Sequence, residues 1–426
     1  MPKKHFIIPA IALYSLLNVA TAQVAGPVWQ QTSAPGPQWR SIACSADGTK
    51  LVAICISCSS LYLSTNSGAT WTPSSASITA ATFAPHSVAS SADGKILAAA
   101  GGAVYVSVDS GATWTSRLTT TGVYQLIGIA MSADGTKLVA AEQSQNYGDN
   151  LGQIYTSSDS GSNWTLRLNG PAVGDIACSP DGTKLIAGGG SVLANAGGYL
   201  YLSTNSGVNW TTNTGPGNNY WTSVACSADG TKLFATEVTS QVGFAQPQFG
   251  LVHVSTNSGA SWDNGVSSAA LNWMSIACSS NGNFVVAASA NQAYFGSYPS
   301  GIVYTSTNSG QSWQLSYAPD ADWWSVACSS DGTKLYGASK AQSIFNSNGG
   351  IYTYVAPPTN SPTMDIASGG GKAFVSWPWP SSGFVLQQNT NLAPSNWVTL
   401  SNVTAVVNQA IVPQTNANNF YRLMMP

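Results

Sequence analysis

Two short phrases alternate along most of this chain, and their spacing limits what it can fold into. The phrase Ser-x-Asn/Asp-Ser-Gly-x-x-Trp occurs six times, at Ser64–Trp71, Ser107–Trp114, Ser157–Trp164, Ser203–Trp210, Ser255–Trp262 and Ser306–Trp313. A second phrase occurs seven times and is marked by Asp47-Gly48, Asp93-Gly94, Asp134-Gly135, Asp181-Gly182, Asp229-Gly230, Asn281-Gly282 and Asp331-Gly332. The resulting period of 41 to 52 residues is that of a propeller blade and is too long for most solenoid repeats.

Each repeat predicts four short antiparallel strands, which we name a to d. Asp-Gly and Asn-Gly pairs between apolar runs supply the positive φ angles of a tight a–b turn. In the Ser-to-Trp phrase, the Asn or Asp side chain can accept backbone hydrogen bonds, the Gly permits a left-handed residue, and the Trp closes the c–d turn. The fourth repeat predicts strands at Asp175–Ser179, Thr183–Ala187, Gly198–Ser203 and Asn209–Thr212. Radial repetition of such units removes exposed sheet edges.

The ends of the repeat array predict the number of blades. Seven a–b units are present but only six complete c–d turns, because the seventh repeat stops at a c-type strand, Gly349–Tyr354. The missing strand is found at the other end, where Trp29 precedes Trp39 by the same ten residues that separate Trp313 from Trp323. We therefore expect an all-β, seven-bladed ring closed by the N-terminal strand.

The Ser-to-Trp phrase resembles the Asp-box, or BNR, repeat of bacterial sialidases and other secreted propellers, over residues 28–356. Two copies keep the acid (Asp109 and Asp159), and four carry Asn in its place (Asn66, Asn205, Asn257 and Asn308). Asn preserves the turn hydrogen bond and tolerates left-handed geometry. The resemblance implies a structural role for these six residues and carries little information about chemistry.

The N-terminus and the composition predict an exported protein. Residues 1–22 contain Lys3-Lys4, an apolar stretch and Ala20-Thr21-Ala22, the pattern of a cleaved signal peptide. We expect the mature chain to be secreted, periplasmic or at the cell surface, without a membrane span, and monomeric. Charged residues make up 7% of the chain and its net charge is −2, so the basic surface of a nucleic-acid binder is not expected.

The seven cysteines fall into two groups. Five occupy one repeat position and are expected to be buried free thiols: Cys44, Cys178, Cys226, Cys278 and Cys328. Cys55 and Cys58 form a Cys-x-x-Cys pair, for which a local disulfide and two free thiols are both admissible. A zinc site would need further ligands, so neither a metal site nor a cofactor is predicted.

Residues 357–363 predict a Pro-rich linker, and 364–426 a small β-sandwich. Expected strands are Lys372–Trp379, Gly383–Gln388, Trp397–Leu400, Val406–Val412 and Phe420–Met424. The segment resembles C-terminal β-modules of large secreted proteins from environmental bacteria. An attachment tail, a second binding module and a stability cap all remain open as its role.

The residues required for catalysis by sialidases are not found. Their substrate carboxylate needs a cluster of three arginines. This chain has four arginines in all, and they are too scattered to form such a cluster: Arg40, Arg117, Arg167 and Arg422. Arg422 lies in the tail, and Arg117 and Arg167 fall on outer strands. Other glycosidases need two carboxylates.

The acids that best suit such a pair are Glu142 and Glu237, with Asp320 and Asp322, but an assignment as ordinary solvated loop carboxylates explains them better. Asp-box endoglucanases resemble tandem double propellers, whereas this chain predicts one ring.

The rim that carries the b–c and d–a connections is the predicted binding surface. Long, variable loops on a rigid scaffold are where binding usually resides, and these loops are rich in amides and aromatics, including Tyr294 and Phe295. Aromatic residues also precede strand a: Tyr220, Trp221, Trp273, Trp323 and Trp324. Trp39, Trp221, Trp273 and Trp323 recur at one repeat position, so packing between blades is the competing interpretation. Tyr220 and Trp324 break the repeat and are expected to be exposed.

Three functions remain at this point. The first is a non-catalytic propeller that binds an extracellular polysaccharide or cell-wall glycan. The second is an exported scaffold for protein assembly, similar in repeat plan to photosystem II assembly factors, although those imply a basic patch that this chain lacks. The third is a glycoside hydrolase of the Asp-box type.

Overall fold

A computed structural model describes residues 28–355, with gaps at 57, 59, 75–85, 121–123, 147–148, 192–195, 239–249, 265–270, 291–300, 317, 320 and 342–348, and seven strands between 365 and 424. The chain divides into two units. Pro27–Ala356 forms one, and residues 1–26 together with 357–426 form the other.

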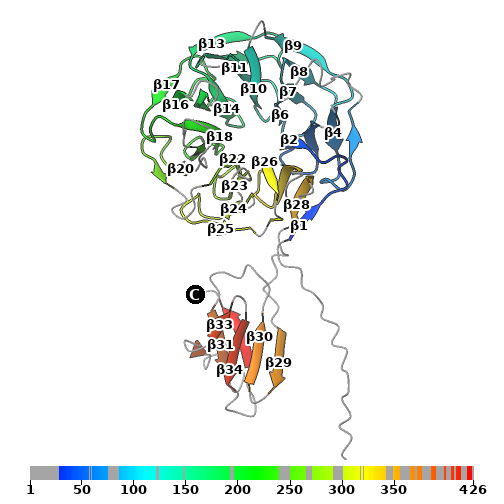
Figure 1. The fold of residues 1–426 in the computed structure, drawn as a ribbon, viewed down its shortest axis with the longest axis vertical. Helices are drawn as coiled ribbons and strands as arrows, with labels where there is room; N and C mark the ends of the chain where they lie inside the picture. Colours follow the sequence, from blue (N-terminus) through cyan, green and yellow to red (C-terminus); the bar gives the residue numbers. More distant parts are fainter. Residues whose placement is uncertain are drawn as a thin grey trace, which may run out of the picture. The chain divides into compact units, whose positions relative to one another are not determined.

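The unit Pro27–Ala356 is a ring of seven antiparallel, four-stranded blades (Figure 1). The innermost strands are β2 (Trp39–Cys44), β6 (Ser87–Ser90), β10 (Tyr124–Met131), β14 (Val173–Cys178), β18 (Tyr220–Cys226), β22 (Trp273–Cys278) and β26 (Asp322–Cys328). The second strands are β3 (Leu51–Cys55), β7 (Leu97–Ala100), β11 (Leu138–Ser144), β15 (Leu185–Ser191), β19 (Leu233–Val238), β23 (Val285–Ser289) and β27 (Lys334–Lys340). Each innermost strand contacts its counterparts on the two neighbouring blades.

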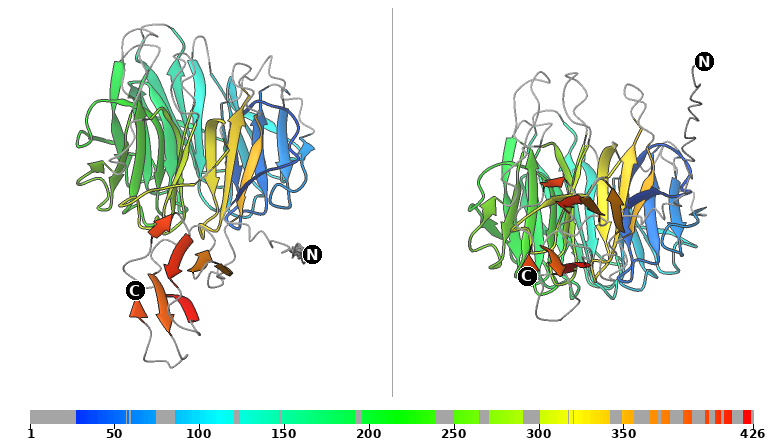
Figure 2. Two further views of the ribbon diagram at one scale, coloured as in Figure 1. Left: turned by 60° about the horizontal axis from the view of Figure 1, so that its bottom comes forward. Right: turned by 90° about the horizontal axis from the view of Figure 1, so that it is seen from below.

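The two outer layers complete the blades. The third strands are β4 (Ser60–Ser64), β8 (Ala103–Ser107), β12 (Gly152–Ser157), β16 (Ala196–Ser203), β20 (Val252–Ser255), β24 (Val303–Ser306) and β28 (Ile351–Val355). The outermost are β5 (Thr72–Pro73), β9 (Thr115–Thr119), β13 (Thr165–Gly170), β17 (Thr211–Asn213), β21 (Asp263–Asn264), β25 (Gln314–Leu315) and β1 (Val28–Gln31). Seen from the side, the strands run between two rims of the ring (Figure 2).

The predicted ring closure is confirmed. Strand β1 pairs with β28, with Val28 opposite Val355, so the last blade has the order β1-β28-β27-β26. Trp29 on this strand is 4% exposed, and its ring centroid lies 5.4 Å from that of Trp323. Its indole N–H donates to Ser316 Oγ at 3.1 Å. The closing strand is therefore held by packing as well as by the sheet ladder.

The Ser-to-Trp turns differ in one detail from the prediction. The Asn66 side-chain oxygen accepts a hydrogen bond from the Thr70 backbone N–H at 2.9 Å, and the other five turns repeat this bond. Ser64 Oγ accepts from the Gly68 N–H at 2.9 Å. The sequence predicts one left-handed residue, the Gly, but the Ser before it also has a φ of +55° to +60° in all six copies.

The Asp-Gly turns also depart from the prediction, because only the Gly has positive φ, between +63° and +78° in the seven turns. In the first turn, Ser45 Oγ, the Thr49 N–H and the Thr49 hydroxyl all donate to Asp47. These bonds favour the ionised carboxylate and lower the pKa of Asp47 to about 2.

The same turns link the blades to one another. The Ser330 N–H donates to the Ala46 carbonyl at 2.8 Å across the closing junction, and five other junctions have the equivalent bond. The seventh junction starts at Pro180, which has no N–H to donate. Lys334 Nζ adds a bond to the Asp47 carbonyl at 2.9 Å. The a–b rim is thus a nearly continuous ring of hydrogen bonds.

Burial explains why each blade is apolar on both faces. The second strands are almost wholly buried, as in β3 and β23, because each blade is covered by a neighbour on either side. One cluster joins Leu335, Val286 and Trp323 across the sixth and seventh blades. The core is therefore a set of layers between blades, which leaves the centre of the ring to the innermost strands.

In the other unit, the described strands form two antiparallel sheets. One has the order β29-β30-β34-β33, with bounds Asp365–Gly369, Lys372–Ser376, Gln409–Pro413 and Thr404–Val406. The second has the order β32-β31-β35, with bounds Val398–Thr399, Val385–Asn389 and Phe420–Met424. The single strand predicted at Val406–Val412 is wrong, because β33 and β34 pair there as two strands. The sandwich arrangement and the domain boundaries remain predictions.

Candidate functional site in the central cavity

The innermost strands carry an irregularity at a common position. In six blades the pairing with the second strand slips by one residue, for example between Trp39 and Ser41 and between Trp323 and Ser325. A β-bulge of this kind leaves one residue unpaired and redirects its side chain. The bulge residues, with the equivalent His86 of the second blade, are Arg40, His86, Ile127, Gly174, Thr222, Met274 and Trp324.

All seven of these residues line one cavity in the centre of the ring. Its volume is about 520 Å³, within the range of small-molecule sites. Most of its lining residues lie in the first half of the innermost strands, and Gln143 and Gln145, at and just past the end of β11, add to its wall. The fold therefore brings one bulge residue from each blade to a common space.

Trp324 is the large aromatic side chain of the bulge ring, and it is only half-buried. Its indole N–H donates to Asp322 Oδ2 at 3.1 Å, which fixes one edge of the ring system. The Arg40 guanidinium carbon lies 5.6 Å and Lys340 Nζ 5.2 Å from the centroid of the indole. Both distances suit cation–π contacts, so two cations flank this indole.

Arg40 is held in place by a neutral partner. One of its terminal nitrogens donates to His86 Nδ1. Burial and the adjacent guanidinium lower the pKa of His86 to about 3, although a hydrogen bond with Gln125 opposes the shift. The imidazole is consequently uncharged at neutral pH and accepts this hydrogen bond. Burial also lowers the pKa of Arg40, which remains a cation at neutral pH.

Asp175 lies at the wall of the same cavity and joins two junctions between blades. Five innermost strands carry Ser at this position. Four of these Ser accept a backbone N–H from the next blade: Ser41 from Val88, Ser223 from Ile276, Ser275 from Val326 and Ser325 from Ile42. In the fourth blade, Asp175 Oδ2 accepts instead from the Val224 N–H at 3.0 Å and from the Ser223 hydroxyl at 2.8 Å.

The second oxygen of Asp175 serves the preceding junction. Gly128 occupies the Ser position in the third blade and has no side chain to offer Ile176. Asp175 Oδ1 accepts from the Ile176 N–H at 2.8 Å in its place. Although part of the residue faces the cavity, burial of the carboxylate outweighs these three bonds and raises its pKa to about 6.

For the four recurrent tryptophans, the interpretation as packing residues between blades is confirmed. Trp39, Trp273 and Trp323 are fully buried and Trp221 is 2% exposed. They directly precede the bulge residues, and pairing at this position turns them between the blades. Trp221 still borders the cavity. The prediction that Tyr220 is exposed is wrong, since it is 8% exposed, although it also borders the cavity.

The description of Glu142 and Glu237 as solvated loop carboxylates is wrong. They are 3% and 4% exposed, because strands β11 and β19 continue past them and bury their side chains. The Tyr155 hydroxyl donates to Glu142 at 3.4 Å, and burial raises the pKa of Glu142. Glu237 Oε1 lies 3.3 Å from His253 Nε2. Neither glutamate lines the cavity. Asp322 is 5% exposed, whereas Tyr294, Phe295 and Asp320 lie outside the described residues.

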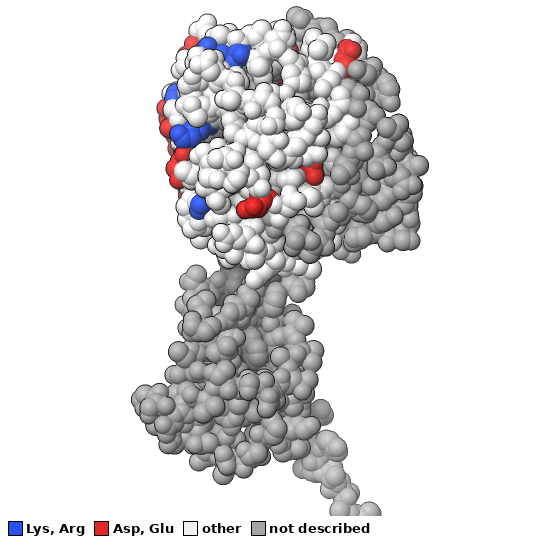
Figure 3. All heavy atoms as spheres, turned by 90° about the vertical axis from the view of Figure 1, so that its left-hand side faces the viewer, with Lys and Arg blue, Asp and Glu red and all other residues white. Residues whose placement is uncertain are grey.

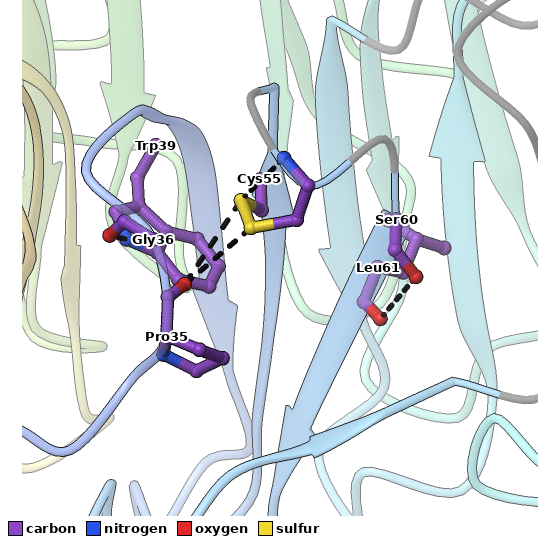
Figure 4. The surroundings of a disulfide bond; sticks show 7 residues. Pro35, Gly36, Trp39, Cys55, Ser60 and Leu61 are labelled. Atoms are coloured by element: carbon purple, nitrogen blue, oxygen red, sulfur yellow. Dashed lines mark hydrogen bonds between the residues drawn. A yellow bond between two sulfur atoms is a disulfide. The ribbon is translucent and has the colours of Figure 1, made fainter.

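Cys55 and Cys58 are joined by a disulfide at the end of β3 (Figure 4). Cys58 Sγ lies 3.5 Å from the carbonyl oxygen of Pro35. The five repeat cysteines are free thiols, and burial raises the pKa of each, to about 12 for Cys44 and Cys226. Within the described chain, no three His, Cys, Asp or Glu side chains are grouped so as to hold a metal ion. No helix long and apolar enough to cross a membrane is found in that part either.

Solved structures with a similar fold include GH74 enzymes and YCF48. The chain superimposes on a GH74 enzyme from Niastella koreensis with a TM-score of 0.57 at 14% identity, covering 90% of this chain and 62% of the enzyme. It superimposes on YCF48 from Cyanidioschyzon merolae with a TM-score of 0.54 at 14% identity, covering 78% and 99%. The superposition on a structure of YCF48 bound to a D1 peptide has a TM-score of 0.54 at 15% identity and covers 78% of this chain and 97% of the YCF48 chain.

These similarities show the propeller fold. The chain spans only 54% to 62% of the length of two GH74 enzymes. No family model matches the sequence, and no curated protein matches it.

The bulge ring is the part of the site that the repeat pattern did not reveal. Of its members, only Trp324 was predicted as a binding residue. The available signal was the residue between the position that is Trp in four repeats and the position that is Ser in five, because this residue differs in all seven repeats. A position that varies more than its two neighbours is one that blade packing constrains less.

Proposed function

We propose that this protein is an exported, non-catalytic propeller of the BNR/Asp-box type that binds a glycan in its central cavity. The observation that carries the proposal is the bulge ring, in which each blade contributes one residue to the wall of a cavity of about 520 Å³ and Trp324 presents a half-buried indole. A flat aromatic surface beside amide side chains such as Gln143 and Gln145 suits the apolar faces and hydroxyls of sugars. Export is supported by the signal-like residues 1–22.

The carboxylates of the cavity support binding rather than hydrolysis. Asp175 is the one Asp or Glu among the described residues that line it. Its two oxygens are occupied by three hydrogen bonds that join neighbouring blades. Glycoside hydrolysis ordinarily needs two carboxylates placed on either side of the scissile bond. Glu142 and Glu237 do not supply them, since both are buried within their blades.

A polypeptide ligand is the second candidate. The observation that favours it is length, because the alignment with this one ring takes in 97% to 99% of two YCF48 chains. Trp and Arg are also the side chains most often found at protein hot spots. The glycan is placed first because the bulge residues surround a concave, open cavity in which a half-buried indole lies beside amide side chains.

The proposal is tested by screening residues 23–426 against a glycan array and insoluble polysaccharides, alongside Trp324→Ala. We expect the variant to weaken binding by about fivefold or more, since stacking on an aromatic ring contributes on the order of 1 kcal/mol or more. Leu166→Ala is the control, because Leu166 is 45% exposed on the outermost strand β13. If no glycan is retained, or if Trp324→Ala binds like the control, the proposed site is wrong and a protein partner becomes the better search.

A further inference from the structure

The cations of the ring are unevenly distributed between its two rims. Six lysines directly follow the a–b turns: Lys50, Lys95, Lys137, Lys184, Lys232 and Lys334. Arg117 and Arg167 lie on outermost strands. In the view of Figure 3, positive charge lies toward one side of the ring and most of the described surface is uncharged. Among the described residues, Arg40 and Lys340 are the remaining Lys and Arg of the ring, and both lie against Trp324.

Arg40 is half-buried, and it lacks the anionic partner that a cation withdrawn from water normally has. Its described hydrogen bond goes to the neutral His86, and no carboxylate of the described residues lies within 4.0 Å of it. A guanidinium has five N–H donors, so most of them remain free to bind a ligand. Removing such a charge from water is costly unless it is paired. The site therefore has a positioned, uncompensated cation at the wall of a cavity.

The charges around Trp324 favour an anionic ligand over a cationic one. Lys340 approaches the same indole and makes no salt bridge among the described residues. Asp322 is the nearby carboxylate, but it is buried and its Oδ2 accepts the indole N–H. The Asp322 carboxylate is thus oriented by its bond to Trp324. Arg40 and Lys340 retain N–H donors that can bind a ligand.

We infer that the central cavity binds a hexuronate unit of an acidic polysaccharide, with the sugar ring against Trp324 and the carboxylate on Arg40. This inference rests on the proposed function and deepens it. The planar guanidinium can give two parallel N–H bonds to a carboxylate, and Lys340 adds a second positive charge. Thr222, Gln143 and Gln145 elsewhere on the wall offer hydroxyl and amide groups for the sugar hydroxyls.

The test compares two ligands that differ only in charge. Trigalacturonate and its fully methyl-esterified form are titrated calorimetrically into residues 23–426 at low ionic strength. We expect the acid to bind at least tenfold more tightly, a difference of about 1.4 kcal/mol. Raising the salt concentration should weaken the binding of the acid and leave the binding of the ester nearly unchanged, because salt screens charge interactions.

Variants assign the preference to Arg40. Arg40→Ala should bring the two affinities to within about twofold of each other, and Lys340→Ala should reduce the ratio less. Arg117→Ala is the matched control, since it removes an exposed arginine on β9 and should leave the ratio unchanged. Melting temperatures of all three variants verify that each has folded.

The outcomes separate the inference from the proposal beneath it. Equal affinity for the acid and the ester, with binding lost in Trp324→Ala, would overturn the hexuronate inference and leave glycan binding intact. Binding of neither, together with an empty glycan array, would overturn both. Equal Arg40-dependent binding of triglutamate would also refute the sugar assignment, since the site would then recognise the carboxylate alone.

Discussion

Replacing Asp175 by Ser tests whether one carboxylate serves two junctions of the ring. Ser is the residue found at this position in five other blades, and in four of them it accepts the next backbone N–H. Asp175→Ser should therefore keep the bond from Val224 and lose the bond from Ile176. An unsatisfied buried N–H costs about 1–3 kcal/mol. This loss of stability is offset at neutral pH, because the variant also removes a carboxylate whose ionised form is disfavoured in the folded protein.

The sign of the pH dependence follows from the raised pKa. Below about pH 4 the Asp175 carboxyl is protonated in both the folded and the unfolded chain. Between pH 4 and pH 6 the unfolded chain has lost this proton and the folded chain retains it, so stability falls as the pH rises. A pKa raised from 3.8 to about 6 corresponds to about 3 kcal/mol. This is an upper value, because part of the residue faces the cavity and its charge is screened there.

The measurement is the difference in melting temperature between wild type and Asp175→Ser at pH 4.5 and at pH 7. We expect the variant to be the less stable at pH 4.5 and to gain up to about 2 kcal/mol relative to wild type by pH 7, since part of the effect has already developed at pH 4.5. For a unit of about 330 residues, Pro27–Ala356, this is about 3 °C at roughly 2.1 cal mol⁻¹ K⁻¹ per residue.

Other titrating groups cancel in this comparison. The turn aspartates, such as Asp181 and Asp229 with pKa values lowered to about 2, contribute stability that is lost only as the pH falls below 4. Glu142, whose pKa is raised, is present in both proteins. A melting difference that is the same within about 1 °C at the two pH values would refute the argument.

A second substitution tests the shared junction directly. Gly128→Ser in the Asp175→Ser background restores the repeat and offers Ile176 a new acceptor. The added Cβ would lie 3.3 Å from Ile176 Cγ2 and 3.4 Å from Ile176 N, close but within reach of a small shift. The double variant should recover part of the stability that Asp175→Ser loses at pH 4.5. No recovery would mean that the lost Ile176 hydrogen bond is not the reason why Asp175→Ser is less stable at pH 4.5.

Two further predictions concern the ends of the ring. Trp29→Ala should lower the free energy of unfolding by about 3–5 kcal/mol, because Trp29 packs on Trp323 within the closing blade; denaturant unfolding that shows a loss below about 1 kcal/mol would contradict this. Cys55→Ser/Cys58→Ser should cost about 2 kcal/mol or less, since a disulfide that closes so short a loop restricts the unfolded chain little. Alkylation of the native protein without reductant, followed by mass spectrometry, should leave Cys55 and Cys58 unlabelled, and labelling of both would show that the disulfide does not form.

The fold could be predicted from the sequence because the repeats specify turns. Positions such as Asp47-Gly48 and Asn66 set the ends of strands through local hydrogen bonds, and these act in every blade. The count of seven followed from a missing strand at one end and a spare one at the other. Local chemistry did not reveal the left-handed Ser67, because a single Gly appeared sufficient for the turn.

The candidate site was harder to predict, because its geometry depends on pairing between strands. Aromatic character pointed to Trp221, Trp273 and Trp323, which the ladder turns into the layers between blades. Glu142 appeared to lie in a loop because the apolar run ends just before it, yet β11 continues to Ser144. A bulge changes which side chains face the centre, and hydrophobic alternation alone does not locate it.

The repeats nevertheless contain the information that separates scaffold from site. A residue that recurs in most blades, such as the Ser that receives the next blade's N–H, is constrained by a contact that recurs with it. The bulge position has no such contact, and it holds Arg, His, Ile, Gly, Thr, Met and Trp in the seven blades. Since a ring with seven equivalent positions could have filled its centre with one residue type, seven different residues make the wall of the cavity asymmetric. Trp324, Arg40 and His86 come from consecutive blades and contact one another in sequence, so the proposed hexuronate unit would meet its aromatic and its cationic partner on one side of the cavity.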